Sequence, residues 1–146
     1  MTAPLYWLTL TALMTAVLAF PYVLERIVRV GMFPALGHNP DSGTSGFDQP
    51  TEKAPAWAKR AHAAHRNALE SLPVFAALVL TAHVAGIGVG AGAAAALVAL
   101  AAKTHFFARL AHYIVYTAGV PVVRTLAFFV ALGALFAIGY AILVPM

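Results

Sequence analysis

The stretch Arg66-Asn67-Ala68-Leu69-Glu70-Ser71-Leu72-Pro73-Val74-Phe75 decides the fold, because it joins a polar cluster to a long apolar run. Its first half places a cation, a carboxamide and a carboxylate within about 1.5 helical turns. The run that follows, residues 71–89, carries no formal charge. Charged groups at the edge of a membrane span are costly unless they line a polar cavity or are paired. The stretch therefore predicts a membrane helix whose polar end faces other polar groups of the protein.

The composition of the whole chain is typical of a polytopic membrane protein. Hydrophobic residues make up 62% of the 146 residues and charged residues 10%, against about 25% charged residues in a soluble domain. The length fits one domain, residues 1–146. The net charge is +4, but the basic residues stand near the ends of apolar segments and form no run, which argues against nucleic-acid binding. The chain has no cysteine, so any thiol chemistry must use a thiol carried by a ligand.

Four apolar segments are long enough to cross a membrane. They predict an all-α integral membrane protein, an antiparallel four-helix bundle with helices at residues 5–30, 56–89, 93–117 and 121–144. The first segment lacks a positively charged leader, which favours a retained helix over a signal peptide, and we expect Pro21 to kink it. Pro73 is tolerated inside the second helix, because neighbouring groups in a membrane bundle satisfy the freed carbonyl. Residues 31–55 are rich in Gly, Pro, Asp, Ser and Thr and predict a loop.

The distribution of lysine and arginine predicts the orientation of the chain. Nearly all of these residues lie in or beside the loops that follow the first and third helices. The positive-inside rule then places both loops on the cytoplasmic side and both termini on the other side. Lys103 is an exception, because it lies near mid-depth of the third predicted helix and not near a loop. Either its side chain packs inside the bundle, or the helix boundaries differ from those predicted.

The third helix carries a polar stripe. His105, Arg109, His112 and Tyr116 fall at i, i+4, i+7 and i+11, on one face. A polar stripe on an apolar membrane helix must face the bundle or a subunit interface. The stripe is therefore either a structural hydrogen-bond network or a ligand site.

Other polar residues allow two interpretations as well. Arg124 stands in the first turn of the fourth helix, where free N–H groups and partial positive charge favour an anion; the alternative is an interfacial anchor under the positive-inside rule. Arg66 and Glu70 are i, i+4 neighbours and could form an ordinary ion pair. No metal motif is found among the histidines and carboxylates.

Two motifs resemble a known family. The pattern Asn67-x-x-Glu70-x-x-Pro73-x-Phe75 looks like the second-helix signature of the MAPEG family, the membrane-associated proteins in eicosanoid and glutathione metabolism. The stretch from Ala108 to Tyr116, ARLAHYIVY, followed by Gly119 and Arg124, resembles the third-helix motif of the same family. The resemblance covers nearly the whole chain. The family includes prostaglandin E and leukotriene synthases and microsomal glutathione transferases.

The resemblance implies a function, a ligand and an assembly. It implies a glutathione-dependent transferase or peroxidase acting on lipophilic electrophiles, as a homotrimer in the cell membrane with sites between neighbouring subunits. Arg124 would hold the glutathione thiolate. The residues implied to bind glutathione are Arg26, Arg66, Asn67, Glu70, Arg109, His112, Tyr116 and Thr125, with Arg29 as the alternative to Arg26. The alternatives are a non-catalytic membrane binding or scaffold protein and a small transporter.

Two positions depart from the family pattern. Ala63 stands where other members have an arginine, which removes one cationic contact. Phe128 stands where prostaglandin E synthases carry a tyrosine, which argues against isomerase chemistry that relies on that hydroxyl. A small multidrug transporter needs an ionisable residue deep in its first helix, and residues 2–24 carry no charge, so this alternative is disfavoured.

Overall fold

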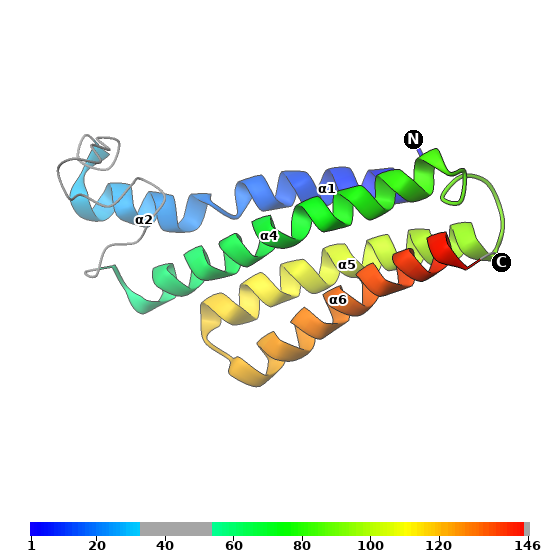
Figure 1. Cartoon of the computed structure of the whole chain (residues 1–146). Helices are drawn as coiled ribbons and strands as arrows, with labels where there is room; N and C mark the ends of the chain where they lie inside the picture. The colour runs from blue at the N-terminus through cyan, green and yellow to red at the C-terminus, as the bar shows by residue number, and fades with distance from the viewer. Residues whose placement is uncertain (33–53, 145–146) are drawn as a thin grey trace.

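The computed structural model describes residues 1–32 and 54–144, which form a bundle of long helices and contain no strand. The helices are α1 (Ala3–Val17), α2 (Phe20–Val30), α4 (Ala56–Val84), α5 (Ala93–Ala118) and α6 (Pro121–Leu143). Helices α1 and α2 follow each other in one direction, and the four spans α1–α2, α4, α5 and α6 alternate in direction, so that the start of α1 lies at the same end of the bundle as the end of α6 (Figure 1). The expected loop, residues 31–55, lies mostly outside the described residues.

Four stretches of the described chain are long and apolar enough to cross a membrane. They are Ala3–Val30, which joins α1 and α2, and the three helices α4, α5 and α6. The predicted all-α membrane bundle of four spanning segments is therefore confirmed. The second span is shorter than the expected 56–89, because α4 ends at Val84 and the chain then turns through Gly86, whose φ of +75° suits a residue without a side chain.

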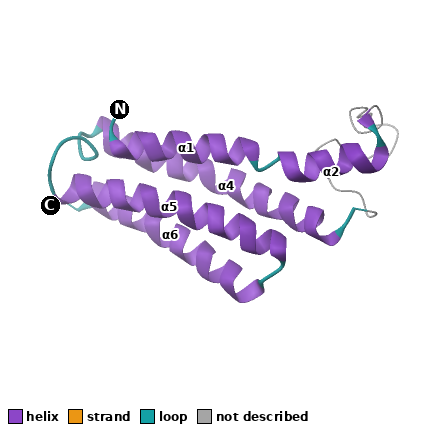
Figure 2. Ribbon diagram, turned by 180° about the vertical axis from the view of Figure 1, so that it is seen from behind, coloured by secondary structure: helices purple, strands orange, loops and turns teal. Residues whose placement is uncertain are grey.

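The first span is broken between α1 and α2, as Figure 2 shows. Helix α1 ends at Val17 and α2 begins at Phe20. Pro21 explains the position of the break, since it has no N–H to donate to the Val17 carbonyl and its ring would collide with that carbonyl. The carbonyl of Leu18, at the break, accepts a hydrogen bond of 3.0 Å from the Tyr113 hydroxyl of α5. The expected kink is thus present, and a neighbouring helix satisfies the backbone there.

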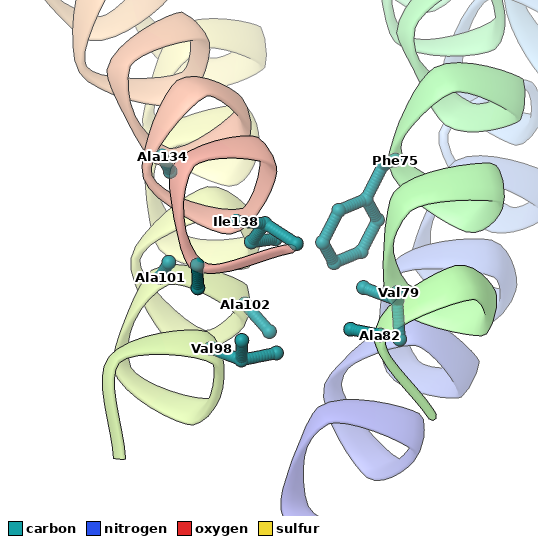
Figure 3. Close-up of a cluster of buried hydrophobic side chains, with 9 residues drawn as sticks. Phe75, Val79, Ala82, Val98, Ala101, Ala102, Ala134 and Ile138 are labelled. Atoms are coloured by element: carbon teal, nitrogen blue, oxygen red, sulfur yellow. The ribbon is translucent and has the colours of Figure 1, made fainter. Parts of the chain in front are cut away.

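An apolar core holds α4, α5 and α6 together at the end of the bundle near the termini. Phe75 and Val79 of α4 point toward Ile138 of α6, with small alanines of α5 beside them (Figure 3). Small residues at a helix contact let the backbones approach closely, which favours packing in lipid. This core fixes the three helices that also form the polar part of the molecule.

The two faces of α4 contact different parts of the protein. Ala58, Ala61, Ala64 and Ala68 form a buried stripe that packs against Leu18, Tyr22 and Tyr113. At 100° per residue this stripe lies on the side of α4 opposite Arg66, Asn67 and Glu70. Helices α1 and α2 therefore cover one side of α4, and its polar side is left facing α5 and α6.

Lys103 lies where neither expectation placed it. The helix boundaries hold at this point, since α5 runs without interruption from Ala93 to Ala118, yet the side chain is exposed and does not pack inside the bundle. It shares the outer face of α5 with the exposed side chains of Leu100 and Phe107. The helical period explains the result, because Lys103 falls outside the stripe that starts at His105.

The hydrogen bond to the broken span can be tested with a pair of tyrosine variants. Tyr113→Phe leaves the Leu18 carbonyl without its donor, so we expect a loss of about 1–2 kcal/mol in the free energy of unfolding. Tyr140→Phe is the matched control, since the Tyr140 side chain is 55% exposed. Thermal denaturation in mild detergent should give a lower midpoint for Tyr113→Phe alone. Equal midpoints for the two variants would show that the hydrogen bond does not support the break.

Candidate functional site

Helices α4, α5 and α6 line an open pocket of about 580 Å³, here called the outer pocket. This volume lies within the range of about 300–1,000 Å³ that is usual for small-molecule sites. The lining residues are His62, Ala63, Arg66, Asn67, Glu70, His112, Tyr116, Arg124, Thr125, Phe128 and Phe129. Four of the eleven are cations or histidines on α4 and α5 or at the start of α6, and a single carboxylate, Glu70, faces them.

The turn between α5 and α6 positions the arginine of the outer pocket. Gly119 ends α5 in the left-handed conformation, with φ of +84°, and Pro121 suits the first turn of α6. Arg60 of α4 donates its Nε–H to the Thr117 carbonyl at 2.9 Å. A Cβ at Gly119 would lie 3.2 Å from the Arg60 guanidinium. The turn is thus held against α4, and this contact sets where Arg124 enters the pocket.

Arg124 is fixed by an aromatic ring. Its guanidinium carbon lies 4.5 Å from the centroid of the Tyr116 ring, a cation–π contact that holds the charge while leaving its N–H donors for a ligand. The first-turn N–H groups of Val122 and Val123 have no partner within the helix by their position. Arginine and helix N-terminus together favour an anion at this edge of the pocket.

The carboxylate of the outer pocket is available to a ligand. Glu70 and Arg66 are 3.8 Å apart, with side chains 65% and 67% exposed. Such a long, exposed pair contributes only about 0.3–0.5 kcal/mol. Thr125 has less to offer as a donor, because its hydroxyl donates to the Pro121 carbonyl at 3.1 Å.

A smaller cavity of about 200 Å³, here called the inner pocket, adjoins the outer pocket toward the apolar core. It shares three residues with the outer pocket and adds six. Its lining is Asn67, Glu70, Ser71, His105, Arg109, Phe128, Ala131, Leu132 and Leu135. The walls on α6 are apolar, while the α5 side presents an imidazole and a guanidinium.

The polar groups of the inner pocket are deeply buried. Arg109 is 3% exposed and donates to the Asn67 side-chain oxygen at 2.8 Å. His105 is 1% exposed, and its ring stacks on that of Phe75 with centroids 4.2 Å apart. The His105 Nδ1 atom lies 3.2 Å from the Ala131 carbonyl oxygen. These contacts hold both side chains in fixed orientations.

The structure brings together most of the residues that the sequence indicates. Seven of the expected ligand residues line the outer pocket: Arg66, Asn67, Glu70, His112, Tyr116, Arg124 and Thr125. Arg109 lines the inner pocket. Arg26 lines neither, because it is buried on α2, which packs against α4. Arg29 is engaged by Glu25 at 2.7 Å. The roles of these residues as ligand contacts stay predictions.

Sequence reasoning missed some of the lining. His62 and Phe129 line the outer pocket but were not among the expected ligand residues. His62, Arg66 and Glu70 stand at i, i+4 and i+8, so the helical period alone could have indicated His62. Among residues 1–32 and 54–144, no group of three or more histidine and carboxylate side chains could hold a metal ion.

The fold and the pockets define a small multi-pass membrane protein with a charged pocket between its helices. Residues 4–144, nearly the whole chain, match the MAPEG family model, and the chain belongs to the MAPEG family. This family includes glutathione transferases and peroxidases. Comparisons with curated proteins and with solved structures found no match.

The contact between Arg109 and Asn67 can be measured with a double-mutant cycle. Asn67→Leu leaves a buried guanidinium without its acceptor, so we expect a loss of about 1.5–3 kcal/mol in the free energy of unfolding. Adding Arg109→Met should recover most of that loss, because the charge is then absent. Arg66→Met is the control and should cost about 0.5 kcal/mol or less. Additive effects in denaturant unfolding would exclude coupling between the two side chains.

Proposed function

We propose that this protein is a glutathione-dependent transferase or peroxidase that acts on lipophilic electrophiles at the membrane. The observation that carries the proposal is the outer pocket, in which a carboxylate, a carboxamide and an arginine at a helix N-terminus converge. Glutathione has one ammonium, two carboxylates and a thiol. Glu70 suits the ammonium, Arg66 suits a carboxylate, and Arg124 suits the thiolate.

The chain supplies binding and electrostatics, and glutathione supplies the nucleophile, because the protein has no cysteine. A free thiol is only a few per cent thiolate at neutral pH. In this proposal the Arg124 guanidinium and the first N–H groups of α6 favour the thiolate over the thiol. The Tyr116 ring keeps the guanidinium in place. Asn67, oriented by Arg109, directs its remaining amide N–H groups at the tripeptide.

The second substrate reaches the sulfur from the bilayer. Phe128 and Phe129 line the outer pocket on the α6 side. Phe129, together with Leu126 and Val130, is exposed on the outer face of the same helix. An electrophile dissolved in lipid can therefore approach along α6 without crossing the polar α4 side. This arrangement supports lipophilic substrates over water-soluble ones.

We also propose self-association into the homotrimer that the family resemblance implies. The exposed face of α5 combines small residues with one charge: Ala96 and Ala111 lie on the same face as Lys103. A lysine at mid-depth is costly against lipid, and small residues favour helix–helix contact. Both features support contact with a second copy. The cations at the end opposite the termini support non-cytoplasmic termini and a pocket that opens toward the cytoplasm.

Replacing Arg124 tests the proposed chemistry. Arg124→Ala should keep much of the glutathione affinity, since the carboxylate contacts lie elsewhere. It should lose the ultraviolet absorbance of bound thiolate and slow conjugation of a model electrophile by about ten- to a hundredfold. Arg124→Lys should recover part of the rate, because lysine lacks the planar fork. The measurement is a pH series at saturating glutathione.

The control is Lys59→Ala, which removes a cation at the same end of α4 that does not line the outer pocket. It should leave the thiolate titration unchanged. Identical titrations for wild type and Arg124→Ala would remove Arg124 from the mechanism. Glutathione binding without any thiolate in the wild type would favour a non-catalytic binding protein.

Replacing Glu70 tests the binding mode. Glu70→Gln removes the partner proposed for the ligand ammonium, and a lost charged hydrogen bond weakens affinity by about ten- to a hundredfold. Calorimetric titration with glutathione measures this change. Lys59→Gln is the matched control, since Lys59 lies on the same helix but does not line the outer pocket. Unchanged affinity with a lower thermal midpoint would mean that Glu70 only supports the helix.

A further inference from the structure

Another open pocket, here called the lateral groove, lies between Pro21 of α2, Trp57 and Arg60 of α4, and the end of α5. Its volume is about 470 Å³, and it shares no lining residue with the outer or the inner pocket. At 100° per residue, Ile114 of the groove falls about 160° around α5 from Tyr116 of the outer pocket. The groove therefore opens on a different side of α5 from the candidate glutathione site.

The polar end of the lateral groove lies at the depth of the lipid head groups. Helix α4 has 29 residues, which at 1.5 Å per residue is about 44 Å, while the hydrocarbon core of a bilayer is about 30 Å thick. The excess lies at the start of α4, because Lys59, Arg60 and Arg66 gather there and residues 71–84 carry no formal charge. Trp57, in the first turn, is 39% exposed, and tryptophan favours the membrane interface.

Arg60 is the charged residue that lines the lateral groove. Its Nε–H donates to the Thr117 carbonyl at 2.9 Å, which holds the guanidinium against the end of α5. The ion pairs among residues 1–32 and 54–144 involve other arginines. The remaining N–H donors of Arg60 are therefore left for an anion that this part of the chain does not supply.

The shape of the lateral groove calls for an anion with an apolar tail. Arginine presents a planar fork that suits a phosphate, and a guanidinium already held in place loses little freedom on binding. The Tyr113 ring and Ile114 line the groove about one turn closer to the bilayer centre than Thr117, and Ile114 is 57% exposed. A soluble anion would leave these apolar walls uncovered, whereas a phospholipid covers both parts.

A second copy of the chain fits the lateral groove less well than a lipid. Among residues 1–32 and 54–144 the acidic side chains are Glu25 and Glu70. Glu25 accepts from Arg29 at 2.7 Å, and its side chain is 12% exposed. Glu70 lines the outer pocket. Neither is free to pair with Arg60 of a neighbouring copy without giving up its present place, whereas anionic lipids are abundant at the cytoplasmic face of membranes.

We propose that the lateral groove binds an anionic glycerophospholipid, with its phosphodiester on Arg60 and one acyl chain along Tyr113 and Ile114. The lipid site is separate from the proposed glutathione site, so it does not depend on whether the protein is an enzyme. Arg60 then contacts both the lipid and the Thr117 carbonyl. The bound lipid thus holds the end of α5 against α4 and stabilises the native bundle.

The test compares two lipids that differ only in their head groups. The full-length protein is delipidated in a neutral detergent, and dioleoyl phosphatidylglycerol or dioleoyl phosphatidylcholine is added in mixed micelles. Phosphatidylglycerol should raise the thermal midpoint in a saturable way, by about 2–6 °C, and phosphatidylcholine should raise it much less. Inorganic phosphate at the same ionic strength should leave the midpoint unchanged, which separates a lipid head group from a free phosphate.

Ala118 offers a position for a charge test, because it is exposed and lines the lateral groove. Ala118→Glu places a carboxylate where it competes with the phosphate for Arg60, and it should weaken the apparent affinity for phosphatidylglycerol by about tenfold or more. Ala118→Gln has the same shape without the charge and should retain most of the affinity. Lys59→Gln lowers the net charge by the same single unit, but Lys59 does not line the groove, so this variant should respond like the wild type.

Native mass spectrometry with an equal mixture of the two lipids gives a second measurement. The wild type should retain phosphatidylglycerol preferentially, and Ala118→Glu should retain both lipids equally. Equal thermal shifts with the two lipids in the wild type would overturn the proposal. Equal losses in Ala118→Glu and Lys59→Gln would do the same, because they would indicate general surface attraction. If Ala118→Glu does not fold, Ile114→Trp fills the apolar part of the groove from its exposed side, and unchanged stabilisation of that variant by phosphatidylglycerol would reject the site.

Discussion

A guanidinium inside a membrane bundle needs an acceptor, and the hydrogen bond of 2.8 Å from Arg109 to Asn67 provides one. This hydrogen bond links α5 to α4 and fixes the position of one helix relative to the other along the bundle axis, because both residues lie well inside long helices. The other polar residues of α5 follow from it at one-turn intervals, with His105 on the inner side and His112 on the outer side. Breaking this contact would leave a charge that neither lipid nor protein could stabilise.

Helix α4 contributes to the fold with one face and to the pockets with the opposite face. On α4 the alanine stripe from Ala58 to Ala68 binds the broken first span, and the opposite face carries Asn67 and Glu70 into the pockets. Small side chains on one face let α1 and α2 approach closely. The polar face lies beside α5 and α6, where Asn67 meets Arg109, and the apolar core around Phe75 holds these helices in place.

Phe128 is the residue of α6 that lines both pockets of the candidate site. It lines the charged outer pocket and the largely apolar inner pocket, and its ring is 6.2 Å from that of His112. A tyrosine here, as in the prostaglandin E synthases of the same family, would place a hydroxyl at this wall. With phenylalanine, the polar residues that line the inner pocket are Asn67, Glu70, Ser71, His105 and Arg109.

The sequence by itself determined the four spans, the break before Pro21 and the polar stripe of α5. These follow from local rules: apolar length, the missing N–H of proline and the helical period. The sequence could not show which helix would meet each face, because periodicity groups residues on one helix and says nothing about the neighbour. Tertiary packing alone decided that Arg26 lies on α2, outside both pockets, and that Lys103 faces outward. It also left His105 Nε2 without a hydrogen-bond partner among the described residues, because that outcome depends on how α4, α5 and α6 pack together.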